Sequence, residues 1–483
     1  MKTLTPHLAL IIALSLIIAA CKAPTAQSTG RQATPSFKSA NSVKFAAFNV
    51  SFAHDRDPSE HFEQWVTFMN MPHARQQALI DSWKAGGLNE HKYRQEHLLA
   101  ERIIQIRNVA AIIQIVRPDV LLLNEFNNDG TGENLSALMG FQKNYLSISQ
   151  SMNSVDGGDM LEPIIYPFLE SYATNTGLPS GMNLANSDSG YDPINPNNAY
   201  GFGYYHGHYA FALMSKYEID KSETRTFQGF KRKDLLSGDE RPINPTINVC
   251  SSERKLPEGM RCGDTWFSAD EWQNIRLSSK NHVDAPINIP TSSGIKTIHA
   301  LLSHPTPPAF DTFSDNNKYR NSAENLFWLH YITGGDMLYD DNGIYGGLGD
   351  KSFVIMGDQN ADTVWGRTTD ERFNGIQDLM FHPRVNQAVS RINGEHLPIS
   401  SGGAQEPNRR GHPHPSIRTA TFGSRADYSV PSADLQVIDS GVYWPAEGEP
   451  GRLLLNDSRV GDRGTDKEVS SDHRLVWVTV ALN

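Results

Sequence analysis

The apolar positions in the first quarter of the chain predict a strand, a helix and a second strand. An apolar run over 43–50 predicts the first strand. Apolar residues then recur at helical spacing from Leu98 to Val116, which predicts a helix with one buried face, and Pro118 ends it. The continuous apolar run over 120–123 is typical of a strand that is buried on both faces.

The rest of the chain predicts short strands between helices and long polar segments. We expect strands over 209–214, 296–303, 352–356, 426–430 and 475–480. Helical spacing marks a polar segment over 60–86 and another over 319–332. In the second, Leu326, Phe327, Leu329 and His330 are expected near the buried face. The stretches 175–203 and 395–424 are rich in glycine, proline and polar residues, which predicts irregular loops.

Strands that end in polar residues and are separated by helices and loops indicate a layered α/β domain. We expect one such domain over 42–483, with insertions at about 51–96, 150–203 and 221–290. The last insertion has little periodicity and is expected to cover the core rather than to form a domain of its own.

The N-terminus has the features of an export signal. Lys2 precedes an apolar run over 8–20, which is short for a membrane span and has the length of a signal-peptide core. The run ends in Ile-Ala-Ala-Cys, which resembles the lipobox of bacterial lipoproteins. Residues 1–21 are therefore expected to be a signal peptide, and Cys21 the lipidated first residue of the mature chain. An ordinary cleaved signal with an incidental cysteine is the alternative.

Residues 22–41 are rich in Ser, Thr, Pro, Ala and Gln and are predicted to form a flexible tether. Lys22, not Asp, follows the cysteine, so the resemblance to lipoproteins does not imply retention in the inner membrane. We expect an exported monomer, either held by its lipid in the bacterial envelope (outer membrane or cell surface) or secreted. The lipid is the only membrane contact expected.

Two further cysteines, Cys250 and Cys262, lie close together in the sequence. In an exported chain such a pair is expected to form a disulfide. Two free thiols are the alternative. A metal site is the weakest interpretation, because no histidine lies between the two cysteines.

Charge narrows the classes of function. The chain has 483 residues and a formal net charge of −11. An acidic chain argues against tight, sequence-independent DNA binding, which depends on cationic surfaces. It does not exclude an enzyme that holds phosphates with a metal ion and a few local cations.

Six polar signals lie at or just beyond predicted strand ends. They are Asn49, Asn124 with Glu125, His304, a Gly-Asp-Gln-Asn sequence with Asp358 and Asn360, Asp427, and a Ser-Asp-His sequence with Asp472 and His473. Each alone has an ordinary explanation, because an aspartate after glycine is usually a turn residue. Their joint occurrence indicates one functional site.

The sequence around these signals resembles the endonuclease/exonuclease/phosphatase superfamily, which includes pancreatic deoxyribonuclease, abasic-site endonucleases, sphingomyelinases and inositol phosphatases. The resemblance extends from Lys44 to Val480. It is carried by FNV at 48–50, PDVLLLNEF at 118–126, YAFALMSKYEI at 209–219, LLSHPTPP at 301–308, VIMGDQNAD at 354–362, SRADYSVPS at 424–432 and SSDHRLVWVTV at 470–480.

The resemblance implies a four-layer α/β (α+β) sandwich, in which two mixed β-sheets pack face to face with helices outside each. It also implies metal-dependent hydrolysis of phosphate esters. Mg²⁺ suits such a site because it needs few carboxylates and keeps waters and substrate oxygens, and Mn²⁺ is the alternative. Glu125 is the principal metal ligand implied, with Asn49 and Asp472 near the ion.

The resemblance also implies roles for the other residues. Asp358 would orient and deprotonate the attacking water, and Asn360 would hold the water or a phosphate oxygen. His473 would donate to the phosphoryl oxygens or transfer a proton, and Asp427 would fix its tautomer and raise its pKa. His304 would stabilise the transition state from the other side, and Asp472 would orient groups near the metal.

The chain departs from the family pattern in two places. Residues 51–96 replace a connection that is usually short, and His304 lies in Ser-His-Pro rather than the commoner Thr-His-Leu. The presence of both His304 and His473 argues against a role in DNA repair, as export does, because abasic-site endonucleases lack the first histidine.

Three other residue groups could bind a metal ion. They are His206 with His208, His412 with His414, and Asn186 with Asp188. The histidine pairs lack an evident third ligand, so polar loops are the simpler interpretation. Ser189 stands where a calcium loop wants glycine, which disfavours the third group.

The leading hypothesis is a metal-dependent phosphodiesterase that acts on extracellular nucleic acid, DNA or RNA, by attack of water on phosphorus. A phosphomonoesterase or a phospholipase C-like enzyme on small or lipid phosphate esters is the alternative, and the acidic charge favours it somewhat. The alternative of another class is a degenerate family member that binds a partner without catalysis. The intact set of polar residues argues against it.

Overall fold

The computed structural model describes residues 40–53, 61–86, 94–235, 243–250, 255–311 and 313–482. The predicted signal peptide with Cys21, and the tether up to residue 39, lie outside this part of the chain. Within it, no helix is both long and apolar enough to cross a membrane.

The first sheet has six strands in the order β11-β12-β1-β2-β4-β3. β1 and β2 are parallel, and the other neighbours are antiparallel. The strands are β1 (Ser42–Asn49), β2 (Val120–Asn124), β3 (Phe168–Ser171), β4 (Phe211–Ser215), β11 (Val437–Val442) and β12 (Val476–Ala481).

The second sheet also has six strands, in the order β10-β9-β8-β7-β5, and β6 pairs with β7 beside β5. β8 and β9 are parallel, so this sheet is mixed as well. The strands are β5 (Glu218–Ile219), β6 (Arg225–Thr226), β7 (His282–Thr291), β8 (Gly294–Ser303), β9 (Phe353–Asp358) and β10 (Asp427–Pro431).

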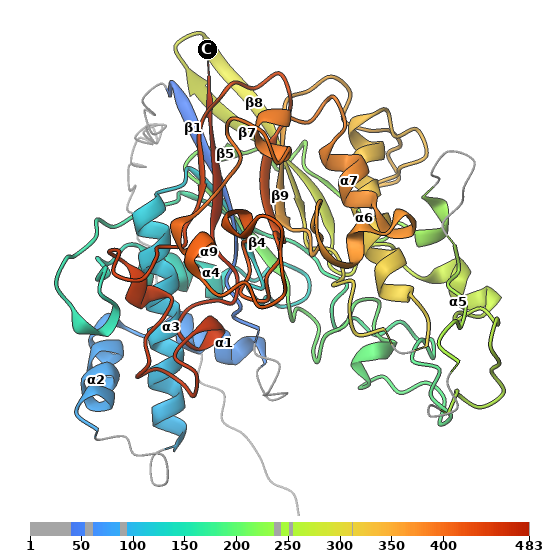
Figure 1. Cartoon of the computed structure of the whole chain (residues 1–483), viewed down its shortest axis with the longest axis horizontal. Coiled ribbons are helices and arrows are strands. Elements are labelled where there is room, and N and C mark those ends of the chain that lie inside the picture. Colours follow the sequence, from blue (N-terminus) through green and yellow to red (C-terminus); the bar gives the residue numbers. More distant parts are fainter. Residues whose placement is uncertain are drawn as a thin grey trace, which may run out of the picture. The chain divides into compact units, whose positions relative to one another are not determined.

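Helices cover the outer faces of the two sheets (Figure 1). α2 and α3 lie on one side of the sheets, and α6 and α7 lie on the other. The helices are α1 (Phe62–Met69), α2 (His73–Lys84), α3 (Arg94–Val116), α4 (Ser136–Phe141), α5 (Ala269–Asn274), α6 (Asn316–Ile332), α7 (Gly375–Met380), α8 (Gln387–Ser390) and α9 (Ser401–Gln405). The expected four-layer sandwich is confirmed.

The apolar pattern of the central strands follows from these layers. All five residues of β2 are buried, because a strand between a helix layer and a second sheet has no face in water. The inner faces meet directly: the Ser429 hydroxyl of β10 donates to the Phe45 carbonyl of β1 at 3.1 Å. Strands of both sheets therefore share one hydrophobic core.

Two sequence-based predictions were wrong in detail. The segment over 60–86 is not one helix, because α1 and α2 are separated around Pro72, whose ring disfavours helical backbone in the residue before it. On α6 the buried apolar face includes Trp328 and Tyr331, which the prediction left out, beside the predicted Phe327. Leu326, Leu329 and His330 are half-buried near this face.

The insertion predicted over 221–290 was too long. Its last residues belong to β7, which pairs with β8 along ten residues within the second sheet. Pro286 and Pro290 disguise this strand, because proline is rare inside sheets. Pro286 is tolerated where it lies between the residues that pair with β5 and those that pair with β6. The insertion over 150–203 likewise contains β3, the edge strand of the first sheet.

The remainder of the 221–290 segment contains a disulfide. Cys250 and Cys262 are bonded, with their Cα atoms 6.0 Å apart. The bond closes a short loop beside α5 in the sequence. Loop closure of this kind restricts the unfolded chain, which stabilises the folded insertion.

His282, at the start of β7, should make stability depend on pH. Its ring is buried, with Nε2 2.9 Å from the Glu324 carbonyl oxygen, and burial lowers its pKa from 6.5 to about 4. The folded state therefore stays neutral where the unfolded state takes up a proton. Above the pKa of His282 in the unfolded state, the full free energy of unfolding is kept. As the pH falls from there through the pKa in the folded state, the free energy of unfolding decreases, by about 3 kcal/mol at about pH 4.

Urea unfolding of the wild type and of His282→Gln, measured between about pH 7.5 and 4.5, tests this expectation. The wild type should lose more unfolding free energy than the variant as the pH falls. Equal losses in the two proteins would show that His282 does not carry the effect.

Candidate active site

The two sheets bring their polar strand ends to one place. β1 and β2 run parallel with Asn49 opposite Asn124, so both side chains lie at the same edge of the first sheet. β9 and β10 run antiparallel with Asp358 opposite Asp427 at the matching edge of the second sheet. Asn124 joins the sheets, because its amide donates to the Ser303 carbonyl at 3.3 Å and accepts from the Asp358 backbone N–H at 3.1 Å.

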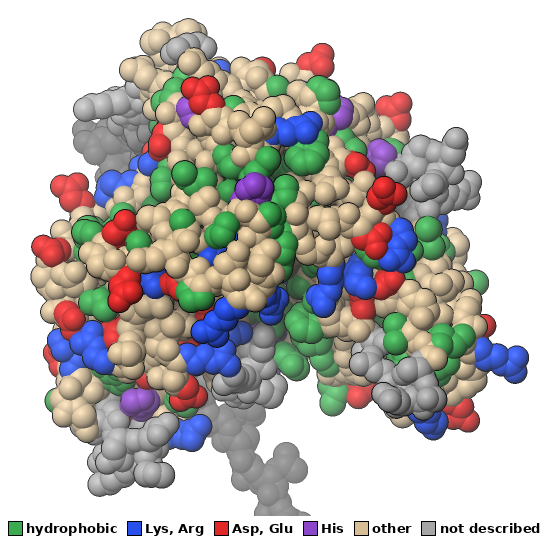
Figure 2. All heavy atoms as spheres, viewed as in Figure 1, with side chains coloured by type: hydrophobic (Ala, Val, Ile, Leu, Met, Phe, Trp, Pro, Cys, Tyr) green, Lys and Arg blue, Asp and Glu red, His purple; other side chains and the backbone are tan. Residues whose placement is uncertain are grey.

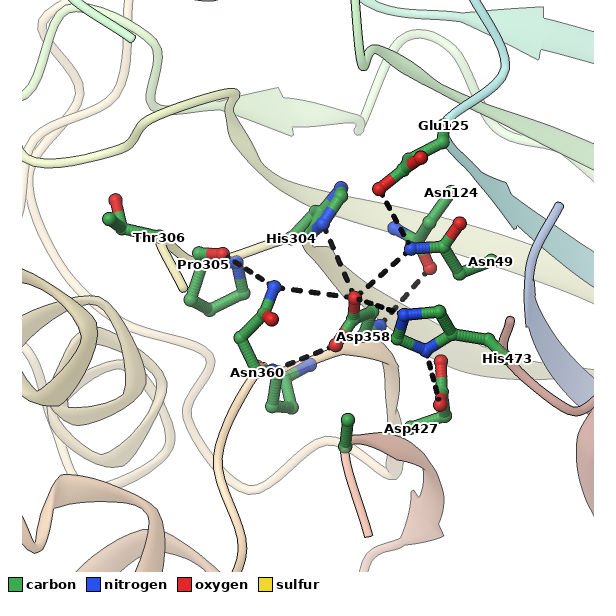
Figure 3. Close-up of polar contacts among 12 residues, drawn as sticks. Asn49, Asn124, Glu125, His304, Pro305, Thr306, Asp358, Asn360, Asp427 and His473 are labelled. Atoms are coloured by element: carbon green, nitrogen blue, oxygen red, sulfur yellow. Dashed lines mark hydrogen bonds and ion pairs between the residues drawn. The ribbon is translucent and has the colours of Figure 1, made fainter. Parts of the chain in front are cut away.

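The Asp358 carboxylate lies at the centre of the site (Figure 3). Asn49 Nδ2 and Asn360 Nδ2 donate to its Oδ2 at 3.1 and 3.3 Å. His304 Nε2 and His473 Nε2 lie 3.4 and 3.7 Å from the same oxygen. Four nitrogen-bearing side chains therefore surround one carboxylate oxygen.

This arrangement keeps Asp358 ionised. Burial alone would raise the pKa of the Asp358 carboxyl, but His473 and His304 outweigh burial and hold the pKa well below its usual range. An ionised carboxylate with its acceptor oxygen in the site is suited to orient a water molecule and to take its proton.

Unusual backbone geometry places three residues around this carboxylate. Glu125 and Asn360 have positive φ angles of 59° and 50°, a region that residues other than glycine rarely adopt. Gly357 has φ 142°, and a Cβ there would lie 2.0 Å from the Ser303 carbonyl oxygen. β9 therefore needs glycine at 357, beside the chain at Ser303, and the turn that follows β9 brings Asn360 back towards Asp358.

His473 and Asp427 form a buried pair beside Asp358. Asp427 Oδ2 lies 2.8 Å from His473 Nδ1, and the Thr419 hydroxyl donates to the same oxygen at 2.7 Å. Burial would lower the pKa of His473, but the carboxylates of Asp427 and Asp358 outweigh it and raise the pKa well above 6.5. His473 is therefore an imidazolium at neutral pH, and its Nε2–H is directed towards the reacting centre.

His304 has the opposite protonation state. Burial, with a contribution from the Lys280 ammonium, lowers the pKa of His304 to about 4. The two histidines that flank Asp358 thus differ at neutral pH: His304 is neutral and His473 is charged. Such a split allows one ring to donate a hydrogen bond without a proton transfer while the other supplies a proton.

The donor set at Glu125 fits a hard cation. Its carboxylate lies at the end of β2, where Asn49 Nδ2 donates to Oε1 at 3.1 Å. Carboxylate and amide oxygens are the ligands that Mg²⁺ prefers. Asn49 Oδ1 accepts from the Ser51 backbone N–H at 3.0 Å, so the amide nitrogen and not the oxygen faces Glu125 and Asp358. The carboxylate of Glu125 is therefore the cation ligand that this arrangement offers, and the predicted metal role of Asn49 stays a prediction.

Asp358, Asp427 and His473 also have ligand atoms within 4.8 Å of one another, and in the described residues they are the one such group of His, Cys, Asp or Glu. Both ring nitrogens of His473 face carboxylates, which is the arrangement of a proton relay. Chemistry therefore favours Glu125 over this group for the cation.

The Asp472 carboxylate contacts Ser51. Its carboxylate accepts a short hydrogen bond from the Ser51 hydroxyl, and the two residues hold the end of β1 against the segment before β12. Its negative charge also helps to raise the pKa of His473. No hydrogen bond between Asp472 and Glu125 or Asn49 occurs in the structure as described, so its predicted metal role stays a prediction.

The other candidate ligands have structural partners. His206 Nε2 lies 2.9 Å from the Thr174 carbonyl oxygen, and His208 packs on Tyr205. His412 Nε2 lies 3.0 Å from Asp362 Oδ2 in a buried pair. The remaining residues of these groups form hydrogen bonds that hold the loops. Asn186 donates to a backbone carbonyl, and Asp188 accepts from a backbone N–H. The backbone N–H of His414 donates to the His412 ring.

Residues 99–473, more than half of the chain, match the family model described as the Endonuclease/Exonuclease/phosphatase family. The chain belongs to this family. Endonuclease/exonuclease/phosphatase enzymes are hydrolases that act on phosphoester bonds, and they are typically dependent on a divalent metal. The polar residues described above are thus the candidate active site of such a hydrolase.

Solved structures of similar proteins have low sequence identity to this chain. An endonuclease/exonuclease/phosphatase from Beutenbergia cavernae is 12% identical, with a TM-score of 0.41, 92% of this chain covered and 72% of that one. A protein of the same description from Bacteroides vulgatus is 11% identical, with a TM-score of 0.37 and coverages of 92% and 99%. A beta toxin mutant from Staphylococcus aureus, solved with bound magnesium ions, is 14% identical, with a TM-score of 0.36 and coverages of 90% and 99%. No curated protein matches the chain.

Lys280 lies beside the site and was not among the residues predicted from the sequence. Lys280 lies just before β7 and its side chain is 6% exposed. Burial lowers the pKa of its ammonium, and the charges of Glu324 first, then of Glu125 and Asp358, act in the opposite direction. In the described part of the chain no group accepts a hydrogen bond from this ammonium. No motif surrounds Lys280 in the sequence, and the strand that follows it, β7, was not predicted. A single lysine in such a place could not be recognised as a site residue.

Proposed function

We propose that this protein is a Mg²⁺-dependent phosphodiesterase that cleaves extracellular nucleic acid by attack of water on phosphorus. The observation that carries the proposal is the geometry around Asp358: the Nε2 atoms of His304 and His473 lie 3.4 and 3.7 Å from its Oδ2 at the centre of the site. A base and an acid are thus present within one site, as in-line displacement at a phosphodiester requires. Mn²⁺ is the alternative cation.

Asp358 would act on the nucleophile. Its Oδ2 would accept a hydrogen bond from water and take the proton as the oxygen attacks phosphorus. Asn360, which donates to the same carboxylate, would keep the water in line. A divalent cation at Glu125, with Asn49 beside it, would neutralise negative charge on the phosphoryl oxygens.

The histidines would act on the rest of the phosphate. His473 Nε2–H would donate to a phosphoryl oxygen or to the leaving oxygen, and Asp427 would hold the ring and its charge in place. His304 would donate from the other side of Asp358. Positioned donors of this kind act where charge develops in the transition state.

The distribution of surface charge supports a polyanionic substrate. Figure 2 shows Lys and Arg side chains on both sides of a hollow near the middle of the face drawn, with apolar side chains inside it. The net charge of −11 therefore does not describe this face, where a phosphate backbone would meet local cations.

The place of action that we propose is outside the cell. The lipobox that ends at Cys21 supports an exported protein held in the envelope by its lipid, and the polar residues that follow support a tether. The membrane partner is the lipid anchor alone, and the protein acts as a monomer.

Incubation of the protein with supercoiled plasmid and Mg²⁺ tests the proposed function. We expect nicking that EDTA stops. An intact plasmid, together with turnover of a phospholipid or of a phosphate monoester, would overturn the nucleic-acid substrate in favour of the lipid or small-ester alternative. No turnover of any phosphate ester would indicate a binding protein.

We expect Lys280 to contribute to phosphate binding in this reaction. Lys280→Met keeps the length of the side chain and removes its charge, so kcat/KM should fall by about 10²-fold, as for the loss of one positioned donor. Lys280→Arg should recover part of the rate. Equal activity of the wild type and Lys280→Met, with unchanged thermal stability, would contradict this role.

A further inference from the structure

A second cavity of about 330 Å³ lies among loops that are not part of the active site. Its walls come from Arg232 and from three segments: the loop over 184–202, the α5 region over 266–276, and residues 310, 311 and 313–320, which lead into and begin α6. The first segment belongs to the long irregular loop that the sequence predicted and to which the proposed chemistry assigns no role.

The charge of this cavity is strongly positive. Arg232, Arg276 and Arg320 line it, and Asp311 is the one carboxylate among the lining residues. The Asn317 backbone N–H donates to Asp311 Oδ1 at 2.8 Å, so this carboxylate already has a partner within the loop. The cavity therefore favours an anion and disfavours a cationic group such as choline.

Arg276 has donors available for a ligand. Its Nη1 donates to Asn175 Oδ1 at 2.8 Å, and its guanidinium lies 4.4 Å above the Tyr200 ring. In the described residues nothing accepts a hydrogen bond from its other N–H groups. A planar guanidinium that is fixed by one contact and open at its other edge is suited to bind phosphate.

The cavity also offers aromatic surface. Phe310 is 86% exposed and has a positive φ of 65°, and Phe202 is 45% exposed. Trp266 and Phe313 also line the cavity and stack on each other, with ring centroids 6.1 Å apart. Exposed rings beside cations form a surface on which a nucleobase can stack while its phosphate meets a guanidinium.

The cavity and the active site are built from the same strand ends. β7 and β8 pair with His282 opposite Ser303, so the chain before β7 and the chain after β8 leave the sheet side by side. Lys280 and then Arg276 lie on the first segment, and His304 and then Phe310 lie on the second. Arg320 is near enough to Lys280 that its charge lowers the Lys280 pKa.

We propose that this cavity binds the nucleotide next to the scissile phosphate, with its base against Phe310 and its phosphate on Arg276. The inference rests on the proposed function and goes further, because it assigns a subsite to loops that the catalytic residues do not use. An anionic ligand with a flat aromatic part satisfies both properties of the cavity. A phosphocholine ester also carries an anionic phosphate, but it has no flat base to stack against Phe310.

Steady-state kinetics of the full-length protein on two substrates test the subsite. A thymidine oligonucleotide can reach the cavity, whereas methyl p-nitrophenyl phosphate offers one phosphodiester and no second nucleotide. Arg276→Ala should raise KM for the oligonucleotide about tenfold and leave the small diester unchanged. Phe310→Ala, at an exposed side chain that folding does not need, should weaken oligonucleotide binding by a similar factor.

Arg391→Ala, at an exposed arginine that follows α8, is the matched control and should change neither substrate. Equal losses on both substrates, or no loss on either, would overturn the subsite. A wild-type protein that turns over the small diester and not the oligonucleotide would overturn it as well. A wild-type protein that hydrolyses neither substrate would instead reject the proposed phosphodiesterase itself, and the subsite with it.

Discussion

Replacing Asp358 with Asn should lower kcat by about 10³- to 10⁴-fold, the loss expected when a general base is removed. The amide keeps the size of the side chain, but it cannot take a proton. It also presents an N–H group to a site in which Asn49, Asn360, His304 and His473 already direct nitrogens at the same atom. The variant would therefore lack the general base but keep a side chain of the same size and shape at position 358.

Stability separates this effect from misfolding. The buried carboxylate is surrounded by donors, so its loss should also change the melting temperature, and kcat must be compared at a temperature at which both proteins are folded. Asp378→Asn, at an exposed position on α7, is the matched control and should keep full activity. Substantial kcat in a folded Asp358→Asn protein would contradict the assignment of the base.

Replacing Glu125 with Gln should raise the Mg²⁺ concentration needed for half-maximal activity and lower the maximal rate by about 10²- to 10³-fold. The reason is that a neutral amide binds a hard cation far less well than a carboxylate does, and a metal ion supplies several kcal/mol of charge stabilisation in such reactions. The hydrogen bond from Asn49 can be kept, because Gln still offers an oxygen to Nδ2.

A titration of activity with Mg²⁺ measures both effects at once. Glu218→Gln, at an exposed residue of β5, is the control and should follow the wild-type curve. If Glu125→Gln and the wild type had the same Mg²⁺ dependence, the cation would have to lie elsewhere. The group of Asp358, Asp427 and His473 would then be the next candidate.

The sequence predicted the parts of this fold in which one segment carries its own pattern. β2 is a run of buried residues and α3 has helical spacing, so both were recognised without a partner. The strand end motifs likewise placed Asn49, Glu125 and Asp358 near one another, because polar residues after buried strands converge at a sheet edge.

Elements that depend on their partners were missed. β7 has apolar residues at alternating positions, but its prolines argued against a strand. Pro286 is tolerated because it lies between the residues that pair with β5 and those that pair with β6. β11 was missed because Asp439 and Ser440 interrupt its apolar residues, and its pairing with β12 includes a bulge.

The details of the site also depend on contacts between distant segments. Asn124 bridges the two sheets, and no local pattern distinguishes it from a turn residue. Lys280 gains its importance from burial near charged residues of α6 and near Glu125 and Asp358 at the ends of two other strands. Sequence spacing cannot report such contacts, because they arise only when the two sheets face each other.

The most direct test of the account is the hydrolysis of methyl p-nitrophenyl phosphate by the wild-type protein as divalent cation is removed and restored. We predict that EDTA stops release of p-nitrophenol, that added Mg²⁺ restores it, and that His473→Ala remains nearly inactive throughout. Full activity in EDTA, or equal rates for the wild type and His473→Ala, would contradict a metal-dependent phosphodiesterase built on these residues.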